Sequence, residues 1–190
     1  MQFITNGPDI PDALLQAHEE GRVVFFCGAG ISYPAGLKGF DWLVDEIYRN
    51  CGTERKRLEE KAFQSKQFDT TLNLLEERLP KGRAGLAMRK SLAKALKPNL
   101  RKKGAIDTHS ALLTLGHGRD GALRLVTTNF DQLFHKAAKR IDRIFQAYGA
   151  PMLPVPKNSR WNGLVFLHGL LPEKPDDTAL NRLVLTSCAF

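Results

Sequence analysis

The stretch Arg22-Val23-Val24-Phe25-Phe26-Cys27-Gly28-Ala29-Gly30-Ile31-Ser32 decides the fold. Residues 22–27 form an almost continuous apolar run, rich in β-branched and aromatic side chains, and this predicts a strand buried on both faces of a parallel sheet. Glycines then end the run abruptly. At the carboxyl end of such a strand, a glycine-rich loop lets the backbone approach a phosphate, and its free N–H groups can surround the anion.

The loop 28–32 completes neither of the common phosphate-binding patterns. No Gly-Lys-Ser/Thr follows it, which excludes a Walker A loop. Tyr33 stands where the Rossmann fingerprint has its third glycine. On its own, the loop therefore leaves two interpretations open, a nucleotide site and a tight turn.

Helical and strand patterns alternate along the rest of the chain. We predict helices at 12–18, 40–50, 53–66, 69–79, 84–97, 108–115 and 130–139, and strands at 22–27, 123–127, 143–146, 163–167 and 182–185. The alternation predicts an α/β fold, a Rossmann-like and mostly parallel sheet flanked by helices. Residues 1–190 form one domain in this interpretation, with a helical insertion at about 40–100. Because the chain stops soon after the last predicted strand, we expect the domain to be incomplete at its C-terminus.

The composition is that of an ordinary soluble protein, with 43% hydrophobic and 25% charged residues among 190. No apolar stretch approaches the roughly 18–20 residues that span a bilayer, and the N-terminus lacks the pattern of a signal peptide. We therefore expect a cytoplasmic protein that does not contact a membrane. The three cysteines, Cys27, Cys51 and Cys188, form neither a disulfide framework nor a CxxC zinc pair. We interpret Cys27 as a small buried residue.

The net charge of +8 is concentrated in the block Lys81–Lys103, which holds nine basic residues and no acidic one. Such a block could face nucleic acid, an acidic partner protein or nucleotide phosphates. It could equally be a solvated helix face followed by a basic loop. No aromatic residues are interleaved with the charges, so a groove that stacks single-stranded bases is not indicated.

Polar residues follow two further predicted strands. Asn129 and Asp131 come directly after 123–127, and His168 comes directly after 163–167. Open α/β sheets bind ligands at the carboxyl ends of their strands, so these side chains should project beside the glycine loop. A neutral histidine there can act as a general base near pH 7. Helix capping, with Thr128 or Asn129 as the N-cap residue and Asp131 in the first turn, is an alternative explanation, and so is a structural role for His168.

Three motifs together resemble the motif series of the sirtuins, over about residues 20–190. In chain order they are Gly-Ala-Gly-Ile-Ser at 28–32, Thr-Thr-Asn-Phe-Asp at 127–131 and His-Gly at 168–169. The resemblance implies NAD as the substrate. It implies that Asn129 holds the ribose and an ordered water, that Asp131 binds the nicotinamide carboxamide, and that His168 is the catalytic base at the ribose hydroxyls. Contacts to the NAD phosphates and the adjoining ribose are implied for Gly28, Ala29, Gly30 and Ser32.

The sequence also departs from the protein-deacetylating sirtuins. Residues 33–38, Tyr-Pro-Ala-Gly-Leu-Lys, lack the family's Asp-Phe-Arg, Thr128 replaces a glutamine, and the four zinc cysteines have no counterpart, so we expect no zinc. This pattern resembles the sirtuin-like NAD hydrolases of bacterial anti-phage systems, in particular the subunit paired with a HerA-type hexameric ATPase. That resemblance implies an NAD⁺ glycohydrolase, a homo-oligomer and a HerA-like partner. Two alternatives remain: an NAD-dependent protein deacylase, and a non-catalytic module that senses nucleotides or binds nucleic acid.

Overall fold

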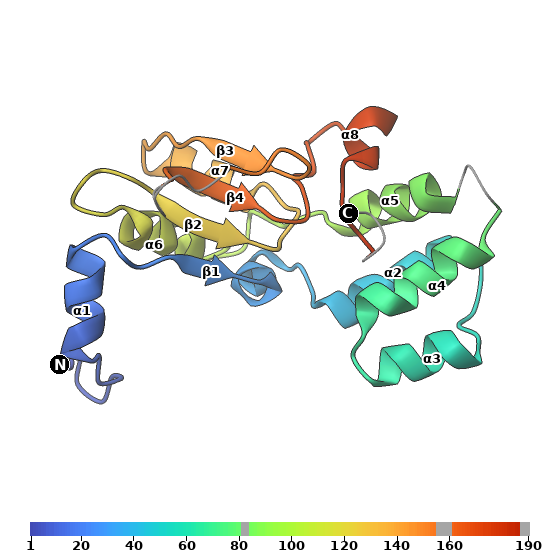
Figure 1. The fold of residues 1–190 in the computed structure, drawn as a ribbon, viewed down its shortest axis with the longest axis horizontal. Helices are drawn as coiled ribbons and strands as arrows, with labels where there is room; N and C mark the ends of the chain where they lie inside the picture. The colour runs from blue at the N-terminus through green and yellow to red at the C-terminus, as the bar shows by residue number, and fades with distance from the viewer. Residues whose placement is uncertain (81–83, 155–160, 187–190) are drawn as a thin grey trace.

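A parallel four-stranded sheet forms the centre of the fold in a computed structural model, which describes residues 1–80, 84–154 and 161–186. The strands are β1 (Phe25–Cys27), β2 (Arg124–Thr127), β3 (Ala147–Gly149) and β4 (Gly163–Phe166). Their order is β1-β2-β4-β3, and every neighbouring pair is parallel. The predicted α/β, Rossmann-like arrangement is confirmed (Figure 1).

Helices precede, connect and follow the strands. In chain order they are α1 (Asp12–Glu19), the 3-10 helix η1 (Ala29–Ala35), α2 (Phe40–Asn50), α3 (Arg57–Gln64), α4 (Phe68–Arg78), α5 (Ala84–Ala95), α6 (Asp107–Gly116), α7 (Leu133–Arg140) and α8 (Asp177–Asn181). Figure 1 shows α2 to α5 gathered beyond the carboxyl ends of the strands, with α6 and α7 against one face of the sheet. Helices therefore occupy the 40–100 region, as expected, and they face the edge of the sheet where ligands bind.

One face of the sheet packs against α6 and α7. The strand register places Phe25, Leu125 and Leu164 side by side on this face. Leu125 and Leu164 are fully buried together with Leu113 of α6 and Phe134 of α7. Since burying one such side chain contributes about 1.5–3 kcal/mol, this layer is a principal source of stability for the sheet.

The opposite face of β1 is exposed. The exposed fraction is 67% for Phe26 and 47% for Val24. Our prediction of a strand buried on both faces is therefore wrong: within the described residues, β1 is a short strand at the edge of the sheet, and it begins only at Phe25. An apolar run predicts a strand, but it carries no information about which neighbours will cover that strand.

Two other predicted strands differ from the structure. Residues 143–146 precede β3, which begins at Ala147. Residues 182–185 do not form a strand, because Leu183 and Leu185 pack into the core of the helical group instead of pairing with the sheet. Hydrogen bonds that hold the backbone of this segment include those from Arg89 Nε to Leu183 O at 3.0 Å and from Val184 N to His168 O at 2.9 Å.

The basic block does not form one continuous exposed surface. Arg89 is buried, and it donates to Leu183 O and to Glu76 Oε1. Lys90 pairs with Asp177 at 2.9 Å. Lys81 lies outside the described residues. The loop at 97–103 is exposed, so contact between nucleic acid and this part of the block stays a prediction.

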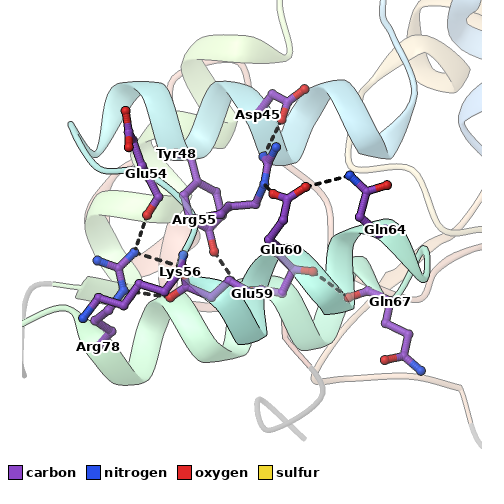
Figure 2. A network of polar contacts seen from close by, with 11 residues as sticks. Asp45, Tyr48, Glu54, Arg55, Lys56, Glu59, Glu60, Gln64, Gln67 and Arg78 are labelled. Atoms are coloured by element: carbon purple, nitrogen blue, oxygen red, sulfur yellow. Dashed lines mark hydrogen bonds and ion pairs between the residues drawn. The ribbon is translucent and has the colours of Figure 1, made fainter.

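A polar network joins the start of α3 to the end of α4 (Figure 2). Glu59 is only 3% exposed, and its carboxylate accepts from Arg78 Nε at 2.7 Å, from Arg78 Nη2 at 3.1 Å and from Lys56 N at 2.6 Å. Arg55 bridges Asp45 and Glu60 nearby. Because a carboxylate bound by a guanidinium at two atoms has a defined geometry, this contact holds the start of α3 against the end of α4.

Within the described ranges, no helix has the length and the hydropathy that crossing a bilayer requires.

Candidate active site

Three segments at the carboxyl edge of the sheet supply the polar residues of the site. Ser32 lies in η1, directly after β1. Asn129 and Asp131 lie in the turn between β2 and α7, and His168 follows β4. Because the strands are parallel, these carboxyl ends meet at one edge, and the four side chains line one cavity of about 480 Å³. The structure thus brings these four residues together, and their individual roles stay predictions.

Hydrogen bonds join the site residues that follow β1 to those that follow β2. Asn129 Nδ2 donates to Gly28 O at 3.2 Å and to Ser32 Oγ at 3.1 Å. Ser32 Oγ in turn donates to Asp131 Oδ2 at 2.9 Å. All three side chains are buried. Such an arrangement holds the polar atoms in place, so that a ligand would not have to order them.

Asp131 connects the site to the start of α7. Its Oδ1 accepts from Leu133 N at 3.0 Å, which satisfies one of the free N–H groups at the helix N-terminus. Burial raises the pKa of Asp131, while the hydrogen bonds from Leu133 and Ser32 act in the opposite direction. The expected N-cap at Thr128 or Asn129 is wrong, because α7 begins at Leu133 after Gln132. Asp131 can satisfy the helix N-terminus and also belong to the site, since each contact uses a different carboxylate oxygen.

His168 presents a neutral imidazole to the cavity. Burial lowers its pKa, so the ring is uncharged near pH 7. Its ring lies 5.8 Å from that of Phe130, and no hydrogen-bond partner for the buried Nδ1 occurs among the described residues. The backbone oxygen of His168 accepts from Val184 N. A neutral imidazole held in this way can accept a proton from a bound molecule.

The fold itself does not require the glycines of the loop. A Cβ at Gly30 would meet no atom within 4 Å, and one at Gly28 would meet only Thr128 Oγ1, at 3.8 Å. Neither glycine has a positive φ. Ala29 lines the cavity, whereas Gly28 and Gly30 are exposed beside it. The space next to these glycines is therefore available to a ligand that approaches the backbone, as a pyrophosphate does.

The helical group supplies the opposite wall of the cavity, which the sequence did not reveal. Phe40 and Leu43 come from α2, and Phe68 comes from α4, with its ring 5.9 Å from that of Phe40. Lys38 and Lys66 also line the cavity. No local pattern marks these residues, because only the packing of α2 and α4 against the sheet edge brings them to the site.

His109 is a buried member of the same cluster that sequence reasoning missed. It lies in α6, and its Nε2 is 3.4 Å from Ser32 Oγ. The helical spacing of His109, Leu113 and Gly116, all of which are buried, was the available signal, since it places them on the inner face of α6.

In the part of the chain that the structure describes, no group of three or more histidine, cysteine or acidic residues is placed to hold a metal ion. Burial raises the pKa of Cys27 to about 11, so its thiol is protonated and unreactive at neutral pH. This agrees with the interpretation of Cys27 as a small buried residue. Cys188 lies outside the described residues.

Fold and site together define a Rossmann-like α/β unit whose cavity, at the carboxyl edge of the sheet, has a cluster of polar side chains on one side and an apolar wall on the other. Residues 123–190 match the family described as the SIR2-like domain, and that range includes Asn129, Asp131 and His168. SIR2-like domains use NAD. The glycine loop and most of the helical group lie before the matched range.

Comparison with curated proteins found a long relative. The uncharacterized protein y4cA of Sinorhizobium fredii (strain NBRC 101917 / NGR234) is 34% identical over 193 residues. The match covers 97% of this chain and 15% of that protein. The chain thus spans a small part of its relative's length. No solved structure matches the chain.

Proposed function

We propose that the cavity binds NAD⁺ and that the protein hydrolyses the bond between nicotinamide and ribose. The observation that carries this proposal is the convergence of Asn129, Asp131 and His168 on one cavity, within the range that matches the SIR2-like domain. That family includes NAD-hydrolysing enzymes. The buried contacts of Ser32 with Asn129 and Asp131 support the proposal, because they fix the positions of the polar groups that would face the substrate.

In the proposed reaction, the bond between C1′ of the ribose and the pyridinium nitrogen breaks, and its electron pair leaves with nicotinamide. Water forms the new bond to C1′, and its proton passes to a base. The products are ADP-ribose, nicotinamide and one proton. Asn129 would position the ribose and the water, and the neutral imidazole of His168 would act at the ribose hydroxyls and accept the proton. Asp131 would bind the carboxamide of nicotinamide.

Positive charge at the cavity suits the substrate. Lys38 and Lys66 line it, and the pyrophosphate of NAD⁺ carries two negative charges. Next to the apolar wall of Phe40, Leu43 and Phe68, the flat nicotinamide ring could be shielded from bulk water. The proposal names water as the acceptor because residues 33–38 lack the Asp-Phe-Arg of the deacetylating sirtuins.

The biological setting belongs to the proposal as well. Depletion of NAD in anti-phage defence, assembly into a homo-oligomer and pairing with a HerA-type ATPase rest on the sequence resemblance. If the chain is part of a longer protein, as in the relative, other segments contribute to these properties.

The test is incubation of the protein with NAD⁺, with chromatography of nicotinamide and ADP-ribose, alone and together with the partner ATPase. Asn129→Ala and His168→Ala should each lower the rate about 10²–10⁴-fold, the usual contribution of a positioned acid–base group. His117→Ala, which alters a histidine outside the cavity, is the matched control and should retain the wild-type rate. Circular dichroism checks that each variant folds.

Two results would contradict the proposal. Absence of NAD⁺ loss in every assembled or activated state would exclude hydrolysis. Wild-type rates in both Asn129→Ala and His168→Ala would show that the chemistry occurs elsewhere. Consumption of an acetylated peptide in step with NAD⁺ would instead establish the deacylase alternative.

A further inference from the structure

His109 is a buried polar residue to which the proposed reaction assigns no task. Its exposed fraction is 0%, and its ring packs edge-on against Phe134 at 4.9 Å. Among the described residues, Nδ1 has no hydrogen-bond partner, and Nε2 faces Ser32 Oγ at 3.4 Å. An apolar side chain of similar size would fill this space without leaving a buried nitrogen unsatisfied. Packing alone therefore does not explain why this position holds an imidazole.

The hydroxyl of Ser32 determines what His109 can do. A hydroxyl has one hydrogen to donate and two lone pairs to accept with. Ser32 donates its hydrogen to Asp131 Oδ2 and accepts one hydrogen from Asn129 Nδ2. The position left at the oxygen is a lone pair, and His109 Nε2 faces the same atom. The contact is favourable in this arrangement only if Nε2 carries a hydrogen.

The protonation of His109 is restricted by its surroundings. Burial lowers its pKa to about 4, so the ring is neutral and carries a single hydrogen. With that hydrogen on Nε2, the hydrogen of Ser32 remains directed at Asp131. With it on Nδ1, the bare Nε2 would compete with Asp131 for the hydrogen of Ser32, and Oδ2 of the carboxylate would lose its donor, while Oδ1 would keep the hydrogen bond from Leu133 N.

We propose that His109 is a positioning residue of the site: it donates from Nε2 to Ser32 and thereby reserves the hydrogen of Ser32 for Asp131. The chain of contacts His109–Ser32–Asp131 orients the buried carboxylate at the edge of the cavity, and its hydrogen bond from Ser32 opposes the rise in the pKa of Asp131 that burial causes. The effect on Asp131 exists in the free protein. Its consequence for NAD⁺ turnover rests on the function proposed above.

Three substitutions separate this role from simple packing. His109→Leu removes the donor and keeps an apolar filling. His109→Gln places an amide nitrogen near the position of Nε2, whereas His109→Asn places one near Nδ1. His135→Leu is the matched control, since His135 is also largely buried with an unpartnered Nδ1, but it packs on Phe166 and makes no hydrogen bond to Ser32 among the described residues.

Two measurements on the protein without NAD⁺ test the proposal. Nitrogen-15 NMR of the imidazole should show the hydrogen of His109 on Nε2 at pH 7. Carbon-13 NMR titration of Asp131 should show a higher pKa in His109→Leu and in His109→Asn than in wild type, and restoration in His109→Gln. The other titratable groups lining the cavity, Lys38, Lys66, Asp69 and His168, are the same in every variant.

With NAD⁺ present, kcat/KM should fall about 2- to 10-fold in His109→Leu, the range that one neutral hydrogen bond supplies, and recover in His109→Gln. A hydrogen on Nδ1, or an unchanged titration of Asp131 in His109→Leu, would overturn the proposal. An equal change in His135→Leu would also overturn it, because the effect would then be one of packing. If the NMR results hold and wild type does not turn NAD⁺ over, the positioning role stands and the proposed function fails.

Discussion

The substitution Gly30→Ala tests whether the glycine is required for ligand binding and not for folding. A Cβ at this position meets no atom within 4 Å, and the φ of Gly30 is one that alanine adopts readily. Gly30 lies inside η1, where an alanine is better tolerated than a glycine. If its role is to let a pyrophosphate approach the backbone, the substitution should harm binding and spare folding.

The size of both effects follows from this geometry. Replacing glycine by alanine in a compatible conformation stabilises a protein by about 0.4–1 kcal/mol, because the unfolded chain loses freedom. For a chain of this length, each kcal/mol raises Tm by roughly 2–4 °C, so Tm should rise by about 1–4 °C. A methyl group in the path of a phosphate should weaken NAD⁺ binding at least about tenfold, which corresponds to about 1.4 kcal/mol.

Thermal denaturation and isothermal titration calorimetry with NAD⁺ measure the two quantities separately. Gly52→Ala is the matched control, because a Cβ at Gly52 also meets no atom within 4 Å, although the φ of Gly52 is +65°. Alanine in that left-handed conformation costs about 1–2 kcal/mol. The control should therefore lower Tm and leave NAD⁺ binding unchanged, the reverse of Gly30→Ala.

Wild-type affinity for NAD⁺ in Gly30→Ala would refute the assignment of the loop to the phosphates. A fall in Tm would refute the statement that the fold does not require glycine there.

Two further predictions concern stability. Glu59→Gln removes the carboxylate that Arg78 binds and should lower the free energy of unfolding by about 1.5–3 kcal/mol in urea denaturation at pH 7. Burial raises the pKa of Glu59, but its hydrogen bonds from Arg78 and Lys56 outweigh burial and lower the pKa overall. The stabilisation is therefore present above the ordinary glutamate pKa of 4.5 and is lost as the pH falls below that value. The free energies of unfolding of wild type and Glu59→Gln should converge in acid, and a difference that stays constant with pH would contradict this account. Phe26→Thr should lower the free energy of unfolding by less than about 1 kcal/mol, because Phe26 is exposed. Phe166→Ala, at a fully buried position, should lower it by about 3–5 kcal/mol. Equal decreases in the two variants would show that the outer face of β1 is covered.

The parts of the site that sequence could predict are those that follow strands directly. Asn129, Asp131 and His168 each come within a few residues of a recognisable apolar run, and the carboxyl ends of parallel strands necessarily share an edge. Chain connectivity and strand direction were sufficient to place them beside Ser32.

The residues that reach the site through tertiary packing were not predicted. Lys66 arrives from the α3–α4 connection, and His109 arrives from the inner face of α6. The run at 182–185 has the composition of a strand, yet Leu183 and Leu185 are buried among helices. Hydrophobic periodicity predicts that a side chain will be buried, but it does not predict which elements of the fold will cover that side chain.

The segment that crosses from the core to the cavity gives the protein an internal reporter of occupancy. Leu183 and Leu185 are anchored in the helical core, Val184 between them lines the cavity, and the amide of Val184 is bonded to the oxygen of His168. A molecule that fills the cavity and contacts both residues should slow solvent exchange of this one amide hydrogen. Hydrogen–deuterium exchange at Val184 would then report the fraction of ligand-bound protein without an attached dye and in the absence of turnover. It could therefore serve to screen nucleotides for binding.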